Sequence, residues 1–338
     1  MENYLIVRTH GLKLRLLKPE DYNRLLTASL KELPHILSTT DYRDVIEGVR
    51  VEEINSHAFF KILFGKYLQR VNLLSEFLSE DLRKLIKAYA LGRYEAENIK
   101  NILIAIASEE PISVQELYPV EMHFPIDHLA NIREIDDVID ILRRLGWHYS
   151  LRAFEMYGLQ GYLSIIECSV DADYFSSLYK LLKKVPHTKK VKRLIDLESD
   201  LCWLYWVIVF KMKNIDITQV RHFLGSLGKN LRRVEYLIED ASIDDIPTII
   251  AHVHQYEDLR DILSRAIREH DYVLIEYGLS SKLYHEAIKT LRHNFMDLAY
   301  VFAYLLISEM ELHNLYMIFA GKKANLSTEE IQRFLYLQ

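Results

Sequence analysis

The chain has 338 residues, more than one hydrophobic core normally holds, and its length predicts two or three domains. Half of the residues are hydrophobic, while Gly (11) and Pro (7) are scarce, a composition that favours long helices with few turns. A formal net charge of −6 argues against a general nucleic-acid-binding protein, which normally carries a basic excess. The two cysteines, Cys168 and Cys202, are too few for a disulfide framework and lack the spacing of a zinc or redox motif, so we expect a cytoplasmic location.

The amino-terminal third predicts helices. The first residues contain no sustained apolar core, and no signal peptide is expected. Pro19 with Glu20 and Asp21 indicates a helix start, because Pro is tolerated in the first turn and acids favour the positive end of the helix dipole. We expect this helix to continue to about Lys31. Apolar residues then recur at helical spacing between residues 55 and 107, which predicts long amphipathic helices.

An acidic motif in the middle of the chain is open to two interpretations. Asp136, Asp137 and Asp140 look like the aspartate-rich, magnesium-diphosphate motif of all-α isoprenoid diphosphate synthases, because acids one helical turn apart can share a divalent ion. The alternative is a solvated charge lattice in which these acids pair with Arg143 and Arg144 on the polar face of a helix. The stretch Ile135–Leu142 also resembles Ile243–Ile250, and both resemble Pro19–Leu26.

A basic run follows, with no acidic residue among its members: Lys183, Lys184, Lys189, Lys190, Lys192 and Arg193. It is either a solvated tip between two helices or a contact for an acidic partner or for the lipid head-group surface. The strongest apolar runs, Leu201–Phe210 and Leu298–Ile307, are about half of the ~20 residues that cross a bilayer, and we expect buried helix segments there. The run Tyr272–Tyr277 is ambiguous between strand and helix.

The last stretch of the chain, Glu309–Leu337, echoes Arg93–Tyr118. Glu311 aligns with Glu95 and Asn314 with Asn98, which suggests a repeated helix-packing contact rather than a chemical site. In both copies a Ser-x-x-Glu capping box opens a second short helix; these boxes are Ser113 with Glu116 and Ser327 with Glu330. A more divergent middle copy has Asp200, Trp203, Thr218 and Arg221 at the positions of Glu95, Asn98, Ser113 and Glu116. The chain is therefore predicted to be all-α, with three diverged helical repeats at residues 1–120, 121–223 and 224–338.

These features together resemble the C subunit of V/A-type ATPases and ATP synthases, in a family that includes the d subunit of the eukaryotic V-ATPase. The residues that carry the resemblance are Val7-Arg8, Leu16-Leu17, Glu20-Asp21, the string Tyr94–Ile102 and the stretch Glu311–Gly321. The resemblance implies a funnel-shaped socket of three domains around a pseudo-threefold axis. It also implies a non-catalytic adaptor of the central stalk, or rotor, with no cofactor, bound metal or small-molecule substrate.

In that family the partners are the central shaft subunits of the ATPase head and the membrane proteolipid ring, between which the adaptor transmits torque for proton or sodium transport. The resemblance thus implies a cytoplasmic protein, peripheral on the membrane, without a transmembrane segment. Two alternatives remain at this point: the magnesium-dependent isoprenoid diphosphate synthase suggested by Asp136, Asp137 and Asp140, and a generic helical-repeat scaffold.

Overall fold

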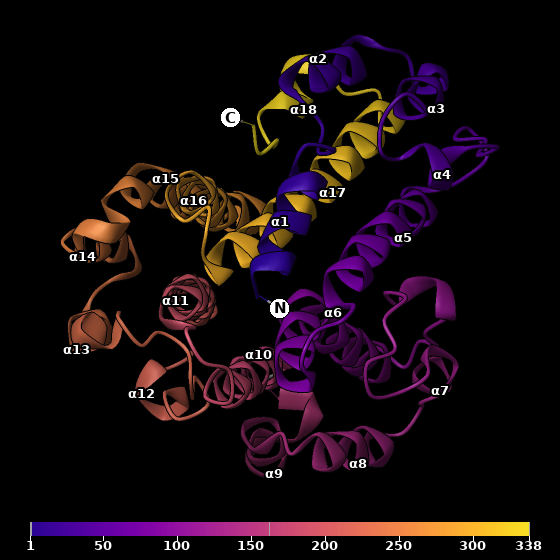
Figure 1. The fold of residues 1–338 in the computed structure, drawn as a ribbon. Coiled ribbons are helices and arrows are strands. Elements are labelled where there is room, and N and C mark those ends of the chain that lie inside the picture. The colour runs from indigo at the N-terminus through magenta and orange to yellow at the C-terminus, as the bar shows by residue number, and fades with distance from the viewer. Residues whose placement is uncertain (1, 162, 338) are drawn as a thin grey trace. The chain divides into compact units, whose positions relative to one another are not determined.

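The computed structural model describes residues 2–161 and 163–337, and within this part every regular element is a helix, as the sequence predicts (Figure 1). The short helices labelled η are 3₁₀ turns. The elements in chain order are α1 (Glu2–Lys13), α2 (Pro19–Thr27), η1 (Leu30–Glu32), α3 (Leu33–Leu37), α4 (Arg43–Ile46), α5 (Ser56–Ser75), α6 (Glu80–Ala107), η2 (Val114–Glu116), α7 (Ile126–Ala130), α8 (Ile135–Leu145), α9 (His148–Gly161), α10 (Leu163–Leu182), α11 (Lys189–Met212), α12 (Ile217–Val220), α13 (Arg232–Asp240), η3 (Ile243–Asp245), α14 (Ile246–Ala251), η4 (His254–Leu259), α15 (Arg260–Glu269), α16 (Tyr272–His293), α17 (Leu298–Lys323) and α18 (Thr328–Gln332).

The chain forms two compact units. Unit 1 combines both ends of the chain, residues 1–90 and 287–338, and unit 2 is the continuous segment 91–286. The chain passes between the units within α6 and again within α16. This division does not test the repeat boundaries near residues 120 and 223, which stay a prediction.

Helix α17 is the core of unit 1. Asp297 starts the helix by accepting the N–H of Ala299, and every residue from Leu298 to Leu312 is buried. Helices α1 and α5 pack on α17, and the rings of Phe59 and Phe319 stack 4.0 Å apart between α5 and α17. The prediction that Leu298–Ile307 is a buried helix segment is confirmed, because a helix that is apolar on all sides must be covered on all sides.

Unit 2 is built around α10 and α11, which pack on each other. The run Leu201–Phe210 lies in α11 with most of its side chains buried, as predicted. Helix α8 packs on α9 and ends at Gly146, whose φ of +67° is the left-handed conformation that a Gly at the end of a helix adopts at little cost. The ambiguous run Tyr272–Tyr277 is helical and forms the start of α16.

Within residues 2–161 and 163–337, none of the helices is both long enough and apolar enough to cross a membrane.

Candidate functional site

Three buried carboxylates make the same kind of contact. Glu95 on α6, Asp200 on α11 and Glu311 on α17 are each at most 3% exposed, and they are the acids that the sequence alignment places at equivalent positions. Each accepts a backbone N–H from a segment that leads into a short helix. The donors are His123 before α7 (3.0 Å, to Glu95), Asn230 before α13 (3.0 Å, to Asp200) and Leu17 before α2 (2.5 Å, to Glu311). The third contact therefore joins the end of the chain to its beginning.

The remaining partners of these acids differ. Glu95 also binds the His123 ring at 2.7 Å, and this hydrogen bond raises the pKa of His123. Asp200 accepts the hydroxyl of Tyr256 at 2.6 Å, while its burial raises the pKa of its carboxyl group. A carboxylate whose oxygens are occupied by internal donors holds structure together and is poorly placed to act on a bound molecule.

Glu311 lies in a buried polar network of unit 1. Its Oε1 atom accepts the Tyr42 hydroxyl at 2.9 Å and pairs with the Arg70 guanidinium at 2.8 Å. Arg70 is only 2% exposed and also bonds to Asp41 (3.1 Å) and to the hydroxyl of Ser308 (2.8 Å). The buried positive charge is thus compensated by two carboxylates, which is the condition under which a buried ion pair is tolerated.

The two aligned asparagines bind the backbone in the same way. Oδ1 of Asn98 accepts the Tyr118 N–H at 2.7 Å and its Nδ2 donates to the Tyr118 carbonyl at 2.9 Å. Asn314 makes the same pair of bonds to Tyr336, at 2.7 Å each. Both asparagines are at most 1% exposed. Each side chain therefore ties the segment that follows a long helix back onto that helix.

The capping boxes are present as predicted at Ser113–Glu116 and Ser327–Glu330. In the middle copy the cap is Asp216, whose carboxylate accepts the Thr218 N–H at 2.9 Å. The alignment of Thr218 with Ser113 was therefore displaced by two residues. The Asp-x-Thr pattern at the start of α12 is the sequence signal that locates this cap.

Two further repeated contacts were missed by sequence reasoning. Lys66 pairs with Asp44 at 2.9 Å, and Lys282 pairs with Asp258 at 2.9 Å. In each pair a cation from a long helix bonds an acid that belongs to the short helices before it. A lysine also binds carbonyl groups at the end of a helix in two copies. Lys322 binds those of Leu26 and Ala28 at the end of α2, and Lys211 binds those of Glu239 and Ala241 at the end of α13. Single charged residues are too common in a sequence for these pairings to stand out.

The acidic motif of α8 forms a surface charge lattice. Asp136, Asp137 and Asp140 are all exposed, and Asp140 pairs with Arg143 at 2.9 Å. Within the described part of the chain, no three His, Cys, Asp or Glu side chains are grouped so that they could hold a metal ion. The charge-lattice interpretation thus fits this surface.

The basic run lies at the connection between α10 and α11. All six of its predicted contact residues, Lys183, Lys184, Lys189, Lys190, Lys192 and Arg193, are exposed, and Lys192 pairs with Asp196 at 2.5 Å. The structure adds a neighbour that the sequence did not indicate: the Nζ atom of Lys229 lies 3.0 Å from the centre of the Tyr179 ring. Burial and the charges of Lys192 and Lys183 lower the pKa of Lys229. We name the six residues of the run together with Lys229 the basic tip.

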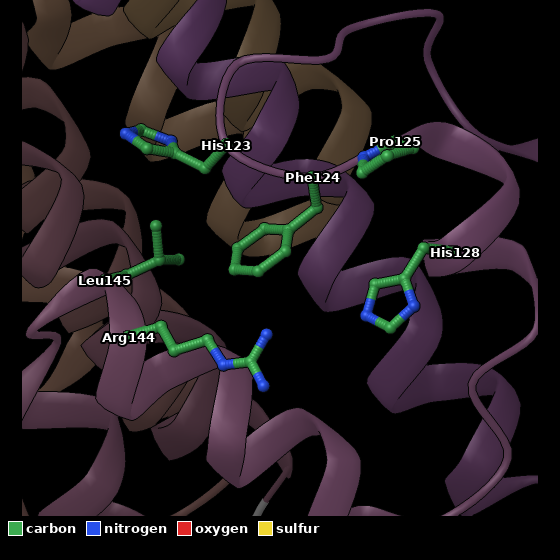
Figure 2. A pocket seen from close by; sticks show the side chains of 6 residues that line it. All are labelled: His123, Phe124, Pro125, His128, Arg144 and Leu145. Carbon is green, nitrogen blue, oxygen red and sulfur yellow. The ribbon is translucent and has the colours of Figure 1, made fainter.

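Unit 2 also contains a cavity of about 630 Å³ beside α7 and α8. Its lining is mostly apolar and consists of His123, Phe124, Pro125, His128, Arg144 and Leu145. Figure 2 shows the Phe124 ring between Leu145, Arg144 and His128, whereas the His123 ring is turned away from it. The lining contains two histidines and no carboxylate, hydroxyl or thiol side chain.

Comparison with known proteins gives a consistent result. The family model for the ATP synthase (C/AC39) subunit matches residues 5–334. The C subunit of the A-type ATP synthase of Methanosarcina acetivorans is 25% identical over 96% of this chain and 89% of the relative. The C subunits of the A-type ATP synthases of Methanosarcina mazei (23% identical, 97% of this chain and 91% of the relative) and Thermoplasma acidophilum (24%, 96% and 96%) are similar over comparable lengths.

Proposed function

The chain belongs to the ATP synthase (C/AC39) subunit family, which comprises the C subunits of V/A-type ATPases, and from this premise we propose that it is the rotor adaptor of such a complex. In this role it connects the central shaft subunits to the membrane proteolipid ring and transmits torque between them, without catalysing a reaction. It works from the cytoplasmic side as a peripheral membrane component, in a complex that couples ATP synthesis or hydrolysis to proton or sodium transport.

The repeated carboxylate contact is the observation that carries the proposal. Glu95 and Asp200 each bind the N–H of a segment further along the chain, whereas Glu311 binds Leu17 at the beginning. A pattern whose last copy returns to the first is cyclic, and it supports three helical repeats around a pseudo-threefold axis that form a funnel-shaped socket. In this proposal Glu95, Asn98, Glu311 and Asn314 are packing residues of the repeats.

The packing of the helices supports a rigid element. A coupling element must resist twisting, and α17 is buried along most of its length while Arg70 links α5 to α17 through Glu311 and Ser308. Polar bonds of this kind fix the register of two helices, because sliding one along the other would leave a buried charge without its partner.

The basic tip is proposed as a contact for an acidic surface, either of a partner protein or of lipid head groups. The six residues of the run lie in the α10–α11 connection and at the start of α11, in a chain of net charge −6, so the positive charge is concentrated locally. Each cation close to an anionic membrane contributes about 1 kcal/mol. Charge reversal at Lys189, Lys190 and Lys192 should weaken retention of the contacted partner in a salt-dependent way. Unchanged retention of both shaft and ring would exclude the basic tip as a contact surface.

Affinity purification of the tagged full chain from native membranes tests the adaptor role. We expect ATPase head, shaft and ring subunits to be recovered together with the chain. Recovery of the chain without any of these subunits would overturn the proposal.

A further inference from the structure

The cavity beside α7 and α8 has walls that the chain itself holds in place. Glu95 accepts the His123 N–H at 3.0 Å and binds the His123 ring at 2.7 Å, and these two bonds fix the segment before α7. On the other wall α8 ends in a closed turn, in which the Trp147 N–H donates to the carbonyl of Leu142 at 3.0 Å. A cavity with fixed walls is formed before a ligand arrives, so binding requires little ordering of the protein.

An aromatic ring lies at the centre of the lining. Phe124 is 8% exposed, and its ring centre lies 6.1 Å from that of His128 with an angle of 29° between the ring planes. Leu145 lies on the other side of the Phe124 ring (Figure 2). The volume of about 630 Å³ is in the range of small-molecule sites, which apolar and aromatic side chains commonly line. A flat ring is the ligand group that packs best on such a surface, because aromatic rings attract each other in offset and edge-to-face contacts.

One charged side chain of the lining has no partner in the described part of the chain. The Arg144 guanidinium makes no hydrogen bond or ion pair there, whereas the adjacent Arg143 pairs with Asp140 at 2.9 Å. Figure 2 shows the Arg144 side chain extending beside the Phe124 ring toward His128. The ring nitrogens of His128 also make no hydrogen bond to any described residue, and an imidazole carries at least one N–H in either protonation state. The cavity therefore offers a planar fork of N–H donors and one further N–H.

The acidic residues near the cavity are not part of its described lining. Glu121 accepts the Ile126 N–H at 3.1 Å, Asp140 is held by Arg143, and Asp127 is exposed outside the lining. A cationic ligand would therefore lack a counter-charge, and a neutral ligand would leave the guanidinium unused. One cation with one additional N–H matches a single negative charge. A carboxylate thus fits better than a phosphate dianion, whose second charge would have no partner.

We propose that this cavity binds a small aromatic carboxylate, a flat acid of one or two rings. The rings of the ligand pack on Phe124 and Leu145, while its carboxylate accepts N–H groups from Arg144 and His128. His123 forms part of the wall and takes no part in charge recognition, because its ring is turned away from Phe124 and is bound by Glu95. The site lies entirely within unit 2, and it is a small-molecule site in addition to the adaptor role.

Isothermal titration calorimetry on the purified full chain tests the site. The probe is naphthoate, and the comparison compounds are naphthamide, which keeps the rings without the charge, and naphthyl phosphate, which carries a second charge. We expect naphthoate to bind about tenfold more tightly than naphthamide, the ratio that a charged hydrogen bond contributes. Equal affinities for naphthoate and naphthamide would overturn the proposal. Tighter binding of naphthyl phosphate than of naphthoate would overturn the assignment to a carboxylate.

The two adjacent arginines of α8 provide a matched pair of variants. Arg144→Gln removes the charge from the lining, so it should weaken naphthoate binding about tenfold and leave naphthamide binding unchanged. Arg143→Gln removes the same charge one residue away, where it is paired with Asp140, and should leave both affinities unchanged. Both arginines are exposed, so both variants should unfold at the wild-type temperature. Equal naphthoate affinities of wild type and Arg144→Gln, or an equal loss in both variants, would overturn the proposal.

Discussion

At the scale of single residues, buried polar side chains show how far sequence reasoning reaches. Asn98 and Asn314 were recognisable as a matched pair because their neighbours are apolar at helical spacing. Their partners were not recognisable, because both asparagines bind backbone groups, of Tyr118 and Tyr336, and every residue offers the same N–H and C=O. Arg70 was missed for a related reason, since a basic residue in a helix is usually exposed.

Replacing either asparagine should cost stability and leave partner binding intact. Asn98→Leu and Asn314→Leu each remove two hydrogen bonds from a backbone segment of intermediate exposure, and we expect a loss of about 1–3 kcal/mol for each variant. Urea denaturation measures this loss. Asn101→Leu, on α6 but only partly buried, is the control and should change little. Lost shaft affinity without lost stability would place Asn314 in an interface.

Glu311→Gln tests the buried ion pair. The amide keeps the shape of the side chain but leaves Arg70 with Asp41 as its only charged partner, so we expect a loss of about 3 kcal/mol in the free energy of unfolding. The double variant Arg70→Met with Glu311→Leu should lose less free energy of unfolding than the single variants Arg70→Met and Glu311→Leu lose in sum. The reason is that each single variant leaves one member of the pair without its partner, whereas the double variant removes both. Additive losses in a double-mutant cycle would contradict a direct interaction.

The contact between Glu95 and His123 should make stability depend on pH. The hydrogen bond to Glu95 raises the pKa of His123 above 6.5 in the folded protein. The resulting stabilisation is complete below the unfolded pKa and is lost as the pH rises through the higher folded pKa. Wild type should therefore exceed His123→Gln in stability by more at about pH 5.5 than at about pH 8.5. In a Glu95→Gln background this difference should disappear; if it persists, another group is responsible.

At the scale of elements, the helices were predictable but several boundaries were not. The first predicted helix was expected to reach Lys31, yet α2 ends at Thr27, because Ser29 and Glu32 form a capping box that opens η1. The sequence contained this Ser-x-x-Glu signal. One sequence alignment is also corrected by the structure. The pair η3 and α14, with Pro247 in the first turn of α14, matches the pair η1 and α3, with Pro34 in the first turn of α3. The stretch Ile243–Ile250 therefore corresponds to Leu30–Leu37 and not to Pro19–Leu26.

Two helix glycines should respond in opposite ways to alanine. In α5, a Cβ at Gly65 would meet no atom within 4 Å, so Gly65→Ala should stabilise the protein by up to about 1 kcal/mol. In α17, a Cβ at Gly321 would lie 2.5 Å from the Cγ1 atom of Ile331, which is a buried residue of α18. Gly321→Ala should therefore cost about 1–3 kcal/mol. Thermal unfolding measures both, and equal shifts would show that α18 does not pack closely on α17.

At the scale of the whole molecule, the sequence predicted an all-helical chain with its strongest apolar runs inside, because composition and periodicity report burial directly. It could not show that residues 1–90 share a core with residues 287–338, since the pairing of distant segments depends on the shapes of their packed faces. The surface around α1 is a similar case. Tyr4, Phe77 and Phe295 are far apart in the chain, and the bonds of Arg8 and His10 to the loops before α6 and α17 bring them together.

This arrangement of the chain predicts how fragments fold. Unit 2 is continuous, so the fragment 80–293, which contains α6 and α16 in full, has its own core and should unfold cooperatively. The fragment 1–107 contains α1 and α5 but lacks α17, against which both helices bury their apolar sides, and it should remain largely unfolded. Far-UV circular dichroism during urea titration distinguishes these outcomes, with the full chain as control.

Adding a peptide of residues 294–338 should restore a cooperative transition to the fragment 1–107, because it supplies α17. A fragment 1–107 that folds alone would mean that α17 is dispensable for the core of unit 1.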